Sequence, residues 1–309
     1  MTIKDVARHD VSEQQIEEAL EDIWGRAFSR WHTMEYDCYS DGELQKMRDE
    51  LLDHIAARTV ADPEPGTAPS HIILRTAAQC ALGLLDLGCY PNGDQEISFA
   101  LIDRKLSSEE TDFGAVVEQV ATARTWLDAF ALAMSSGMIW ERGLVLGLLL
   151  RGDIAPDIRR GVPHSKLESK SDPGELVEMD ALCGYLTPRA EGHLPRHLPS
   201  ETLCRPTAGE RADAQRQLDA LDALTPDQRL LRVLLEDDQV AFEQALEHRL
   251  VHHRESAPAD APPRSLLPHK AIALTALAVQ VHGWDLRVQS AYLPPAMLSA
   301  PEGAPSVSG

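Results

Sequence analysis

The sequence predicts an all-α fold: a multi-helix bundle of antiparallel helical hairpins, in one body or in two lobes, with little or no β-structure. Capping boxes, in which Ser or Thr precedes Glu or Gln by three residues, recur along the chain. Apolar residues behind them recur every three or four positions, the period of a helix with one buried face. Strand patterns are nearly absent, since only residues 96–102 alternate briefly and a loop fits them as well.

The first helix is predicted to begin at Ser12, which forms a capping box with Gln15, while Val11 and Ile16 are spaced for a hydrophobic staple. Its apolar face continues for roughly five turns. The residues of that face are Ile16, Leu20, Ile23, Trp24, Ala27, Phe28 and Trp31. The sequence therefore predicts one continuous helix here.

Two more helices are predicted before residue 90. Ser40 and Glu43 open the second, which stops before Pro63, and Ser70 opens the third, which ends near Gly88. A long fourth helix is expected to open at the capping box of Ser107 and Glu110 and to run to Met134 on one apolar stripe.

Residues 137–150 are apolar nearly all round and are expected to be buried. Asp172 caps a short helix with Pro173 at its first position. Capping boxes at Thr207 and Thr225 open two helices of the C-terminal part, and Asp238 is expected to cap the next. An apolar helix follows, ending in the motifs HGWDL and YLPP.

Two stretches are predicted to be irregular, residues 152–171 and the Pro-rich residues 187–206. The second divides an N-terminal lobe (1–186) from a C-terminal lobe (207–298), with a disordered tail at 299–309, although one continuous domain also fits. Large aromatic side chains on apolar stripes are expected in the core. They are Trp24, Phe28, Trp31, Trp126, Phe130, Trp140 and Trp284.

The formal net charge is -20, and residues 1–70 carry 16 acids against 7 Lys and Arg. A surface of this sign repels nucleic acid, so that class of partner is not expected. It suits a basic protein, although acidity for solubility alone explains it equally well.

The longest apolar stretch, residues 143–150, is too short to span a membrane, and the N-terminus has no apolar segment of a signal peptide. The five cysteines contain no C-x-x-C pair and are expected to be free thiols in the cytoplasm. The sequence therefore predicts a cytoplasmic protein without a membrane partner.

No arrangement of residues predicts catalysis or a cofactor. His248 and His252 are spaced for a helical metal site, but Arg249 stands where a zinc helix would carry its glutamate. His193 and His197 lie among prolines, and Ser135 lacks the G-x-S-x-G frame of a nucleophile elbow. We expect no enzyme, no cofactor and no metal.

Two acidic patches are the candidate partner-binding sites. Glu13, Glu17 and Glu21 stack at i,i+4 on the first helix, beside Glu18 and Asp22. Like charges at this spacing cost roughly 1 kcal/mol in sum, which is small enough to be accidental but also typical of a ridge that meets a cationic partner. The second patch is Glu236, Asp237 and Asp238, expected in the loop of the C-terminal hairpin.

The chain resembles the immunity 49 family of bacterial polymorphic toxin systems. The segments that carry the likeness are residues 30–37, 49–59, 123–142, 178–186, 224–246 and 276–298, in this order. The closing segment contains Gly283, Trp284, Tyr292 and Pro294, and residues 123–142 contain Trp126; all five are expected to have structural roles.

This resemblance implies a mostly helical cytoplasmic protein, encoded beside a toxin, that binds and neutralises it, with no catalytic residue to carry over. A helical-repeat adaptor in a cytoplasmic complex is the alternative. An enzyme that uses a metal at His248 and His252 is a distant third possibility.

Overall fold

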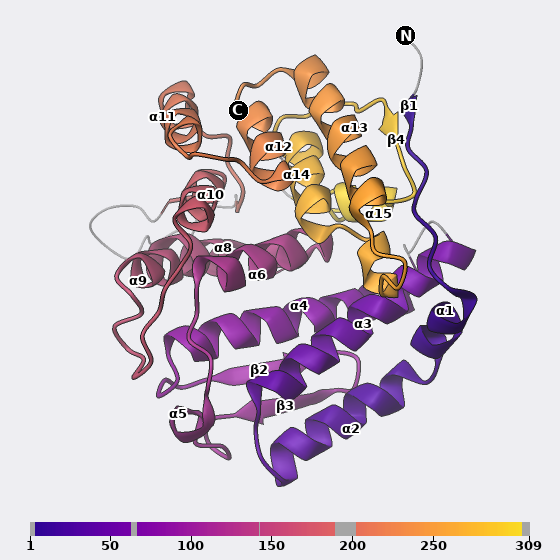
Figure 1. Ribbon diagram of the computed structural model, residues 1–309. Coiled ribbons are helices and arrows are strands. Elements are labelled where there is room, and N and C mark those ends of the chain that lie inside the picture. The colour runs from indigo at the N-terminus through magenta and orange to yellow at the C-terminus, as the bar shows by residue number, and fades with distance from the viewer. Residues whose placement is uncertain (1–3, 63–66, 142, 189–201, 305–309) are drawn as a thin grey trace.

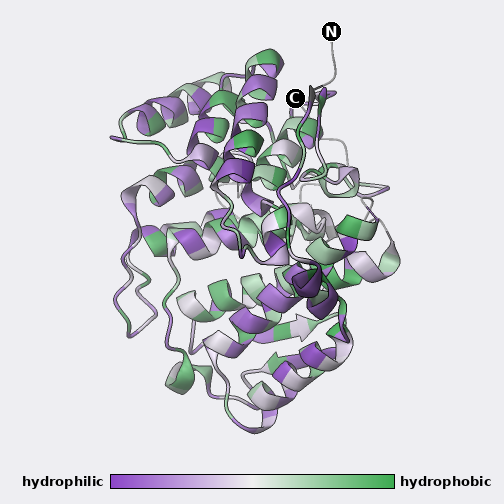
Figure 2. Ribbon diagram, turned by 45° about the vertical axis from the view of Figure 1, so that its right-hand side comes forward, coloured by the Kyte–Doolittle hydropathy of each residue, from purple (hydrophilic) through white to green (hydrophobic). Residues whose placement is uncertain are grey.

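A computed structural model describes residues 4–62, 67–141, 143–188 and 202–304 (Figure 1). Helices dominate it, which confirms the all-α prediction, and the described strands form two small two-stranded sheets. Most helices carry hydrophobic and hydrophilic residues side by side along their length (Figure 2), as expected of helices that bury one face.

The N-terminal layer consists of α1 (Glu13–Leu20), α2 (Ile23–Tyr36), α3 (Asp41–Ala61) and α4 (Ala68–Cys89). The helix α3 packs against the other three. The helix α4 is long and apolar enough to cross a membrane, the only one of that kind in the described residues, but 78% of its apolar window is buried inside the protein. It therefore serves here as a core helix.

The prediction of one continuous first helix is wrong, because the chain breaks between α1 and α2. Asp22 caps α2 by accepting a hydrogen bond from the Gly25 amide, 3.0 Å away. The break turns Ile23, Ala27, Trp31 and Met34 toward the core. Trp24 consequently points outward and is 50% exposed, so its predicted burial is also wrong.

The strands β2 (Glu96–Phe99) and β3 (Arg104–Ser107) form an antiparallel hairpin beside α2 (Figure 1). The prediction that a helix begins at Ser107 is therefore wrong. The Ser107 carbonyl accepts from the amides of Glu110 and Thr111, so the S-x-x-E signal becomes a turn. Burial of Ile97, Phe99 and Leu106 outweighs this local signal.

The long helix begins instead at α6 (Ala123–Ser135), where Thr122 and Thr125 form a capping box. It packs between α4 and α14, and the indole of Trp126 donates to the Leu150 carbonyl at 3.0 Å. The short helix α5 (Phe113–Val116) precedes it. The elements α7 (Met138–Glu141), α8 (Gly143–Leu148), the π-helix η1 (Leu149–Ile154), α9 (Ala155–Arg159) and α10 (Pro173–Cys183) follow it. Helical structure thus extends into residues 152–159, part of a stretch predicted to be irregular.

The C-terminal part contains α11 (Ala208–Asp219), α12 (Pro226–Leu234), α13 (Gln239–Ser256), the 3₁₀-helix η2 (Pro263–Leu266), α14 (His269–Gln280) and α15 (Pro295–Leu298). The strands β1 (Lys4–Asp5) and β4 (Val288–Gln289) pair in parallel and join the two ends of the chain. One buried apolar cluster includes residues from both sides of the predicted connector, so the division into two lobes stays a prediction. Residues 189–201 of that connector lie outside the described residues.

Most predicted helix starts are confirmed. Side-chain caps are present at Ser12, Ser40, Asp172, Thr207, Thr225 and Asp238. Ser70 is an exception, because α4 starts two residues earlier and the Ser70 side chain is buried inside it. Of the aromatic core predictions, Trp31, Trp126 and Phe130 are buried, whereas Phe28, Trp140 and Trp284 pack against the core half-buried.

Candidate partner-binding surface

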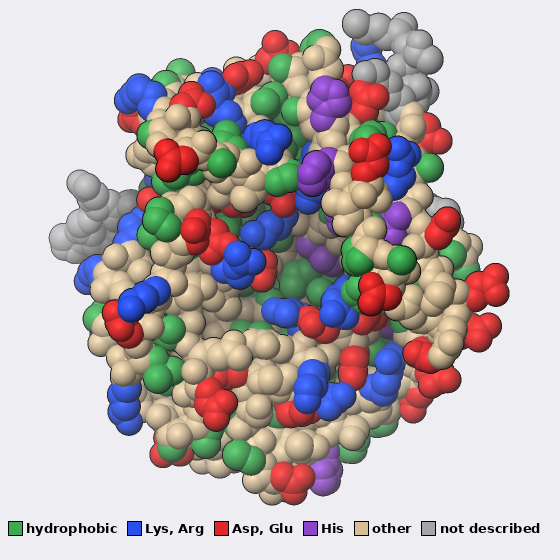
Figure 3. All heavy atoms as spheres, in the orientation of Figure 1, with side chains coloured by type: hydrophobic (Ala, Val, Ile, Leu, Met, Phe, Trp, Pro, Cys, Tyr) green, Lys and Arg blue, Asp and Glu red, His purple; other side chains and the backbone are tan. Residues whose placement is uncertain are grey.

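The five acids of the first predicted patch are all exposed. Glu13, Glu17 and Glu18 lie on α1, Glu21 follows its end, and Asp22 caps α2. Acidic side chains gather over α1 at the right-hand edge of the molecule (Figure 3). Among the described residues, none of the five forms an ion pair with a Lys, Arg or His, and the Glu18 carboxylate accepts a hydrogen bond from Gln14. Their charge is available to a partner.

An aromatic row follows on α2, made of Trp24, Phe28, His32 and Tyr36. The spacing of four residues places these rings on one side of the helix. Trp24 stacks on Phe28 with ring centroids 5.2 Å apart, Phe28 lies 6.3 Å from His32, and His32 lies 4.7 Å from Tyr36. Trp24 is 50% exposed and Tyr36 66%. We call the five acids and this aromatic row the N-terminal surface.

The second predicted patch has a different environment. The Glu236 carboxylate accepts from Arg232 at 2.5 Å, and Asp238 caps α13 by accepting from the amides of Val240 and Ala241. Asp237, between them, adopts a positive φ of 65° and turns inward, so its side chain is only 18% exposed. Each acid of this patch already has a partner within the chain.

Asp237 is the centre of an internal polar network. It accepts from Arg205, forms an ion pair with Arg211 at 3.2 Å, and lies 2.7 Å from Nδ1 of the buried His282. Nε2 of His282 lies 3.0 Å from the Tyr185 hydroxyl. A carboxylate can only accept, so Nδ1–H donates to Asp237 and Nε2 accepts from Tyr185. The network fixes α10, α11, the α12–α13 loop and the end of α14 to one another.

The electrostatics of this network follow from its burial. Burial alone would raise the pKa of Asp237, but hydrogen bonds from Arg205 and His282 hold that pKa below its ordinary value. Burial lowers the pKa of His282 against the opposing effect of the Asp237 carboxylate. The native state therefore holds an ionised carboxylate beside a neutral imidazole.

The closing segment packs around this network. Gly283 has a φ of +70°, a conformation that favours glycine, and the Trp284 amide donates across the turn to the Ala278 carbonyl at 3.1 Å. The Trp284 ring lies against His282 and Phe242, with centroids 4.6 and 5.5 Å away.

Two further residues of the closing segment hold the N-terminal segment and the last helix. Tyr292 is fully buried, and its hydroxyl accepts from the His9 amide at 2.8 Å. Pro294 precedes the first turn of α15.

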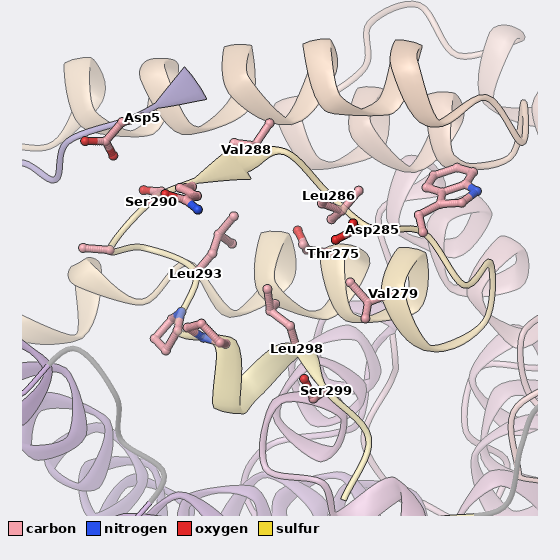
Figure 4. A pocket seen from close by; sticks show the side chains of 15 residues that line it. Asp5, Thr275, Val279, Asp285, Leu286, Val288, Ser290, Leu293, Leu298 and Ser299 are labelled. Atoms are coloured by element: carbon pink, nitrogen blue, oxygen red, sulfur yellow. The ribbon is translucent and has the colours of Figure 1, made fainter. Parts of the chain in front are cut away.

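A groove of about 600 Å³ lies between α14 and residues 284–299, which follow that helix (Figure 4). Thr275 and Val279 line it from α14, and Leu286, Leu293 and Leu298 line it from the closing segment. Its titratable residues are Asp5 and Asp285. This lining supplies neither a base beside a nucleophile nor a cationic group for an anionic ligand.

The candidate metal pair of His248 and His252 is not assembled into a site, whereas the buried Ser135 hydroxyl lies 3.5 Å from Nδ1 of His269. His248 and His252 are exposed on α13, and Arg249 between them pairs with Asp227 at 2.6 Å. Within the described residues, no group of three or more His, Cys, Asp or Glu is placed to hold a metal ion. Burial raises the pKa of Cys89 and of Cys183 to about 12, which leaves these thiols protonated. His193 and His197 lie outside the described residues.

The apolar spacing of the sequence does not reveal the aromatic row, because Trp24 and Phe28 fit one buried stripe with their neighbours. The signal against that stripe is Asp22, an N-cap residue in the middle of the helix that the spacing predicts.

Residues 63–297 match the family model described as Immunity protein 49. The match covers α4 and the closing segment, and it begins after α1, α2 and α3. No curated protein and no solved structure matches the chain.

Proposed function

Since the chain belongs to the immunity protein 49 family, we propose that it protects a bacterial cell by binding a cognate protein toxin and blocking it in a stoichiometric complex. The family supports an immunity role in general. The single observation that carries the binding mode is the N-terminal surface, where exposed aromatic rings lie beside carboxylates that have no cationic partner in the described chain.

The aromatic row provides the binding energy in this proposal. Trp and Tyr are enriched among the residues that dominate protein interfaces, because they bury a large area at a small cost in side-chain entropy. Trp24 and Tyr36 lie on one helix, at the two ends of a row of touching rings. A helix packed on α3 presents them rigidly, which reduces the entropy lost on binding.

The acids of α1 provide attraction at longer range. Exposed carboxylates increase the rate at which a basic protein encounters this surface, and they set its orientation. The toxin of this proposal is therefore a basic protein, at least on the face that is bound. Binding occurs in the cytoplasm, where the toxin would otherwise act.

A protein that blocks a toxin by binding to it does not turn over, so one molecule inactivates one toxin molecule. The test measures this stoichiometry. The toxin encoded beside this gene is expressed with and without this protein, and growth is measured; protection is expected only when both are present. With purified components, residual toxin activity should fall linearly and reach zero near one equivalent of this protein.

Two results would count against the proposal. Protection by a small fraction of one equivalent would indicate an enzyme that modifies or degrades the toxin. Absence of a toxin gene beside this one, together with stable capture of a cellular complex, would favour the helical adaptor instead.

A further inference from the structure

A second feature lies beside the aromatic row, a pocket of about 440 Å³ between α2 and the β2–β3 hairpin. Trp31 and Glu35 line it from α2, Phe99 and Arg104 from the hairpin, and Glu110 from the turn that follows β3. The Trp31 indole donates to the Lys105 carbonyl at 2.9 Å, which fixes the helix to the hairpin. The walls of this pocket are therefore held in place before anything binds.

Two carboxyl groups meet in this pocket. Burial raises the pKa of Glu35, and the neighbouring Glu110, which shares a hydrogen bond with it, raises it further. The Glu35 side chain is partly buried and Glu110 is exposed, whereas the Oε2 atom of Glu35 is covered and has no hydrogen-bond partner in the described residues. Native proteins rarely leave a covered carboxylate oxygen unpartnered, so this oxygen is free to accept from a donor that enters the pocket.

The cations at the rim of the pocket have other partners. The Arg104 guanidinium lies over the Trp31 ring, 5.5 Å from its centroid, and donates to the Asp103 carbonyl at 2.9 Å. The Lys105 ammonium pairs with Glu96 at 2.7 Å. Asp103 adds a third carboxylate to the lining. Among the described residues, neither base forms an ion pair with Glu35 or Glu110, although the Lys105 ammonium is close enough to Glu110 for a longer-range attraction.

We infer that this pocket receives a lysine or arginine side chain of the toxin, with its cationic head between Glu35 and Glu110. The aliphatic stem would lie along Trp31 and Phe99, as long basic side chains do on apolar surfaces. A cation in this position supplies the donor that Glu35 Oε2 lacks and relieves the repulsion between the two carboxylates.

Continuity with the aromatic row points to a protein side chain. The Trp31 ring lies 5.3 Å from Phe28 and 6.0 Å from Tyr36, so one partner surface can cover the row and enter the pocket. A metal ion fits less well, because no group of three or more ligand residues is assembled among the described residues. This inference rests on the proposed function and adds to it the chemistry of one anchoring contact.

The first test needs no toxin. Butylammonium chloride is titrated into the full chain while the indole N–H signal of Trp31 is followed by NMR, with butanol as the neutral control. A saturable shift is expected with the ammonium compound and not with butanol. It should disappear in the double variant Glu35→Gln and Glu110→Gln, and persist in the matched variant Glu109→Gln and Glu118→Gln. A shift that persists in the first double variant would overturn the inference.

The second test uses the toxin domain encoded beside this gene. Its Kd should rise at least about 30-fold in the Glu35→Gln and Glu110→Gln variant, the expected loss when a desolvated charge pair at an interface is broken. The matched Glu109→Gln and Glu118→Gln variant should change Kd less than about fivefold, as for exposed charges. The melting temperature should not fall, since two glutamines do not repel; if it does, Glu110→Gln alone is used.

The two proposals fail differently. If the wild-type chain binds the toxin and the Glu35→Gln and Glu110→Gln variant binds it equally well, the pocket assignment is wrong and the proposed function stands. If the wild-type chain does not bind the toxin, the proposed function is wrong, and the toxin contact inferred for the pocket is wrong with it.

Discussion

The two acidic segments of this chain, residues 13–22 and 236–238, look alike in the sequence and differ in the folded protein. The acids on α1 and at its end are exposed and have no ion pair among the described residues, whereas Glu236 pairs with Arg232 and Asp237 lies in a polar network. The last acid of each segment, Asp22 or Asp238, caps a helix. The difference lies in their neighbours: Arg205, Arg211 and His282 come from distant parts of the chain and converge only on Asp237. Which run of acids keeps its charge unpaired is therefore decided by the cations that the fold brings to it.

The largest expected effect is on the stability of the protein, which should depend on Asp237 of the second acidic segment but not on the acids of the first. Asp237→Ala leaves two arginines and a buried histidine without their common acceptor, so the free energy of unfolding should fall by about 3–5 kcal/mol. Glu17→Ala on α1 should change it by less than about 0.5 kcal/mol. Urea denaturation of both variants measures the contrast. A similar small loss for both would mean that Asp237 is as free as the α1 acids.

The next effect is on binding and concerns the aromatic row. Replacing Trp24 and Tyr36 by Ala should weaken toxin binding by about 2 kcal/mol or more, roughly 30-fold in Kd, because exposed aromatic anchors dominate interfaces. The free energy of unfolding should change little, since both side chains are at least half exposed. Titration calorimetry and urea denaturation measure the two quantities.

Trp126→Ala is the matched control for the aromatic row. Trp126 is fully buried and donates to the Leu150 carbonyl, so its removal should cost about 3–5 kcal/mol of stability. Unchanged affinity after loss of Trp24 and Tyr36 would exclude the aromatic row from the interface.

A smaller effect is expected on the rate of association. Reversing Glu13, Glu17 and Glu21 to Lys should slow toxin association about tenfold at low salt, and the difference should shrink as salt screens the charges. Stopped-flow mixing at several ionic strengths measures it. If neither the rate nor its salt dependence changes, the acidity of α1 serves solubility only.

The smallest expected effect is a pH dependence of the free energy of unfolding, caused by the internal polar network around Asp237. His282 has a folded-state pKa below 6.5, so the unfolded chain takes up its proton first as the pH falls. Its contribution therefore lowers the free energy of unfolding from about pH 6.5 downward and adds nothing above it. His9, His253 and His269 also have lowered pKa values and act in the same direction.

Variants can separate the contribution of His282 to this pH dependence from the contributions of the other histidines. His282→Gln should lower stability at pH 7 but flatten its decline between pH 7 and 5, as measured by urea denaturation at each pH. Glu13→Gln should leave that decline unchanged. If the free energy of unfolding declines equally steeply with pH in His282→Gln and in the wild type, His282 does not cause the pH dependence.

The pocket beneath the aromatic row could not be predicted from the sequence. Glu35 and Glu110 are 75 positions apart, and their meeting depends on a β-hairpin where the capping pattern at Ser107 predicts a helix start. The resemblance to a known family, by contrast, lies in the order of separate sequence segments, and the match over residues 63–297 confirms it.

The sequence by itself determined the helical class, the caps at Ser12, Thr207, Thr225 and Asp238, and the exposure of the α1 acids. These features depend on hydrogen bonds and spacings within about four residues, which a linear pattern contains. The tertiary structure alone decided that Trp24 faces outward, that Asp237 turns inward, and that Glu35 meets Glu110. Each of these depends on which distant side chains fill the space beside a residue, because burial and ion pairing are properties of packing between segments.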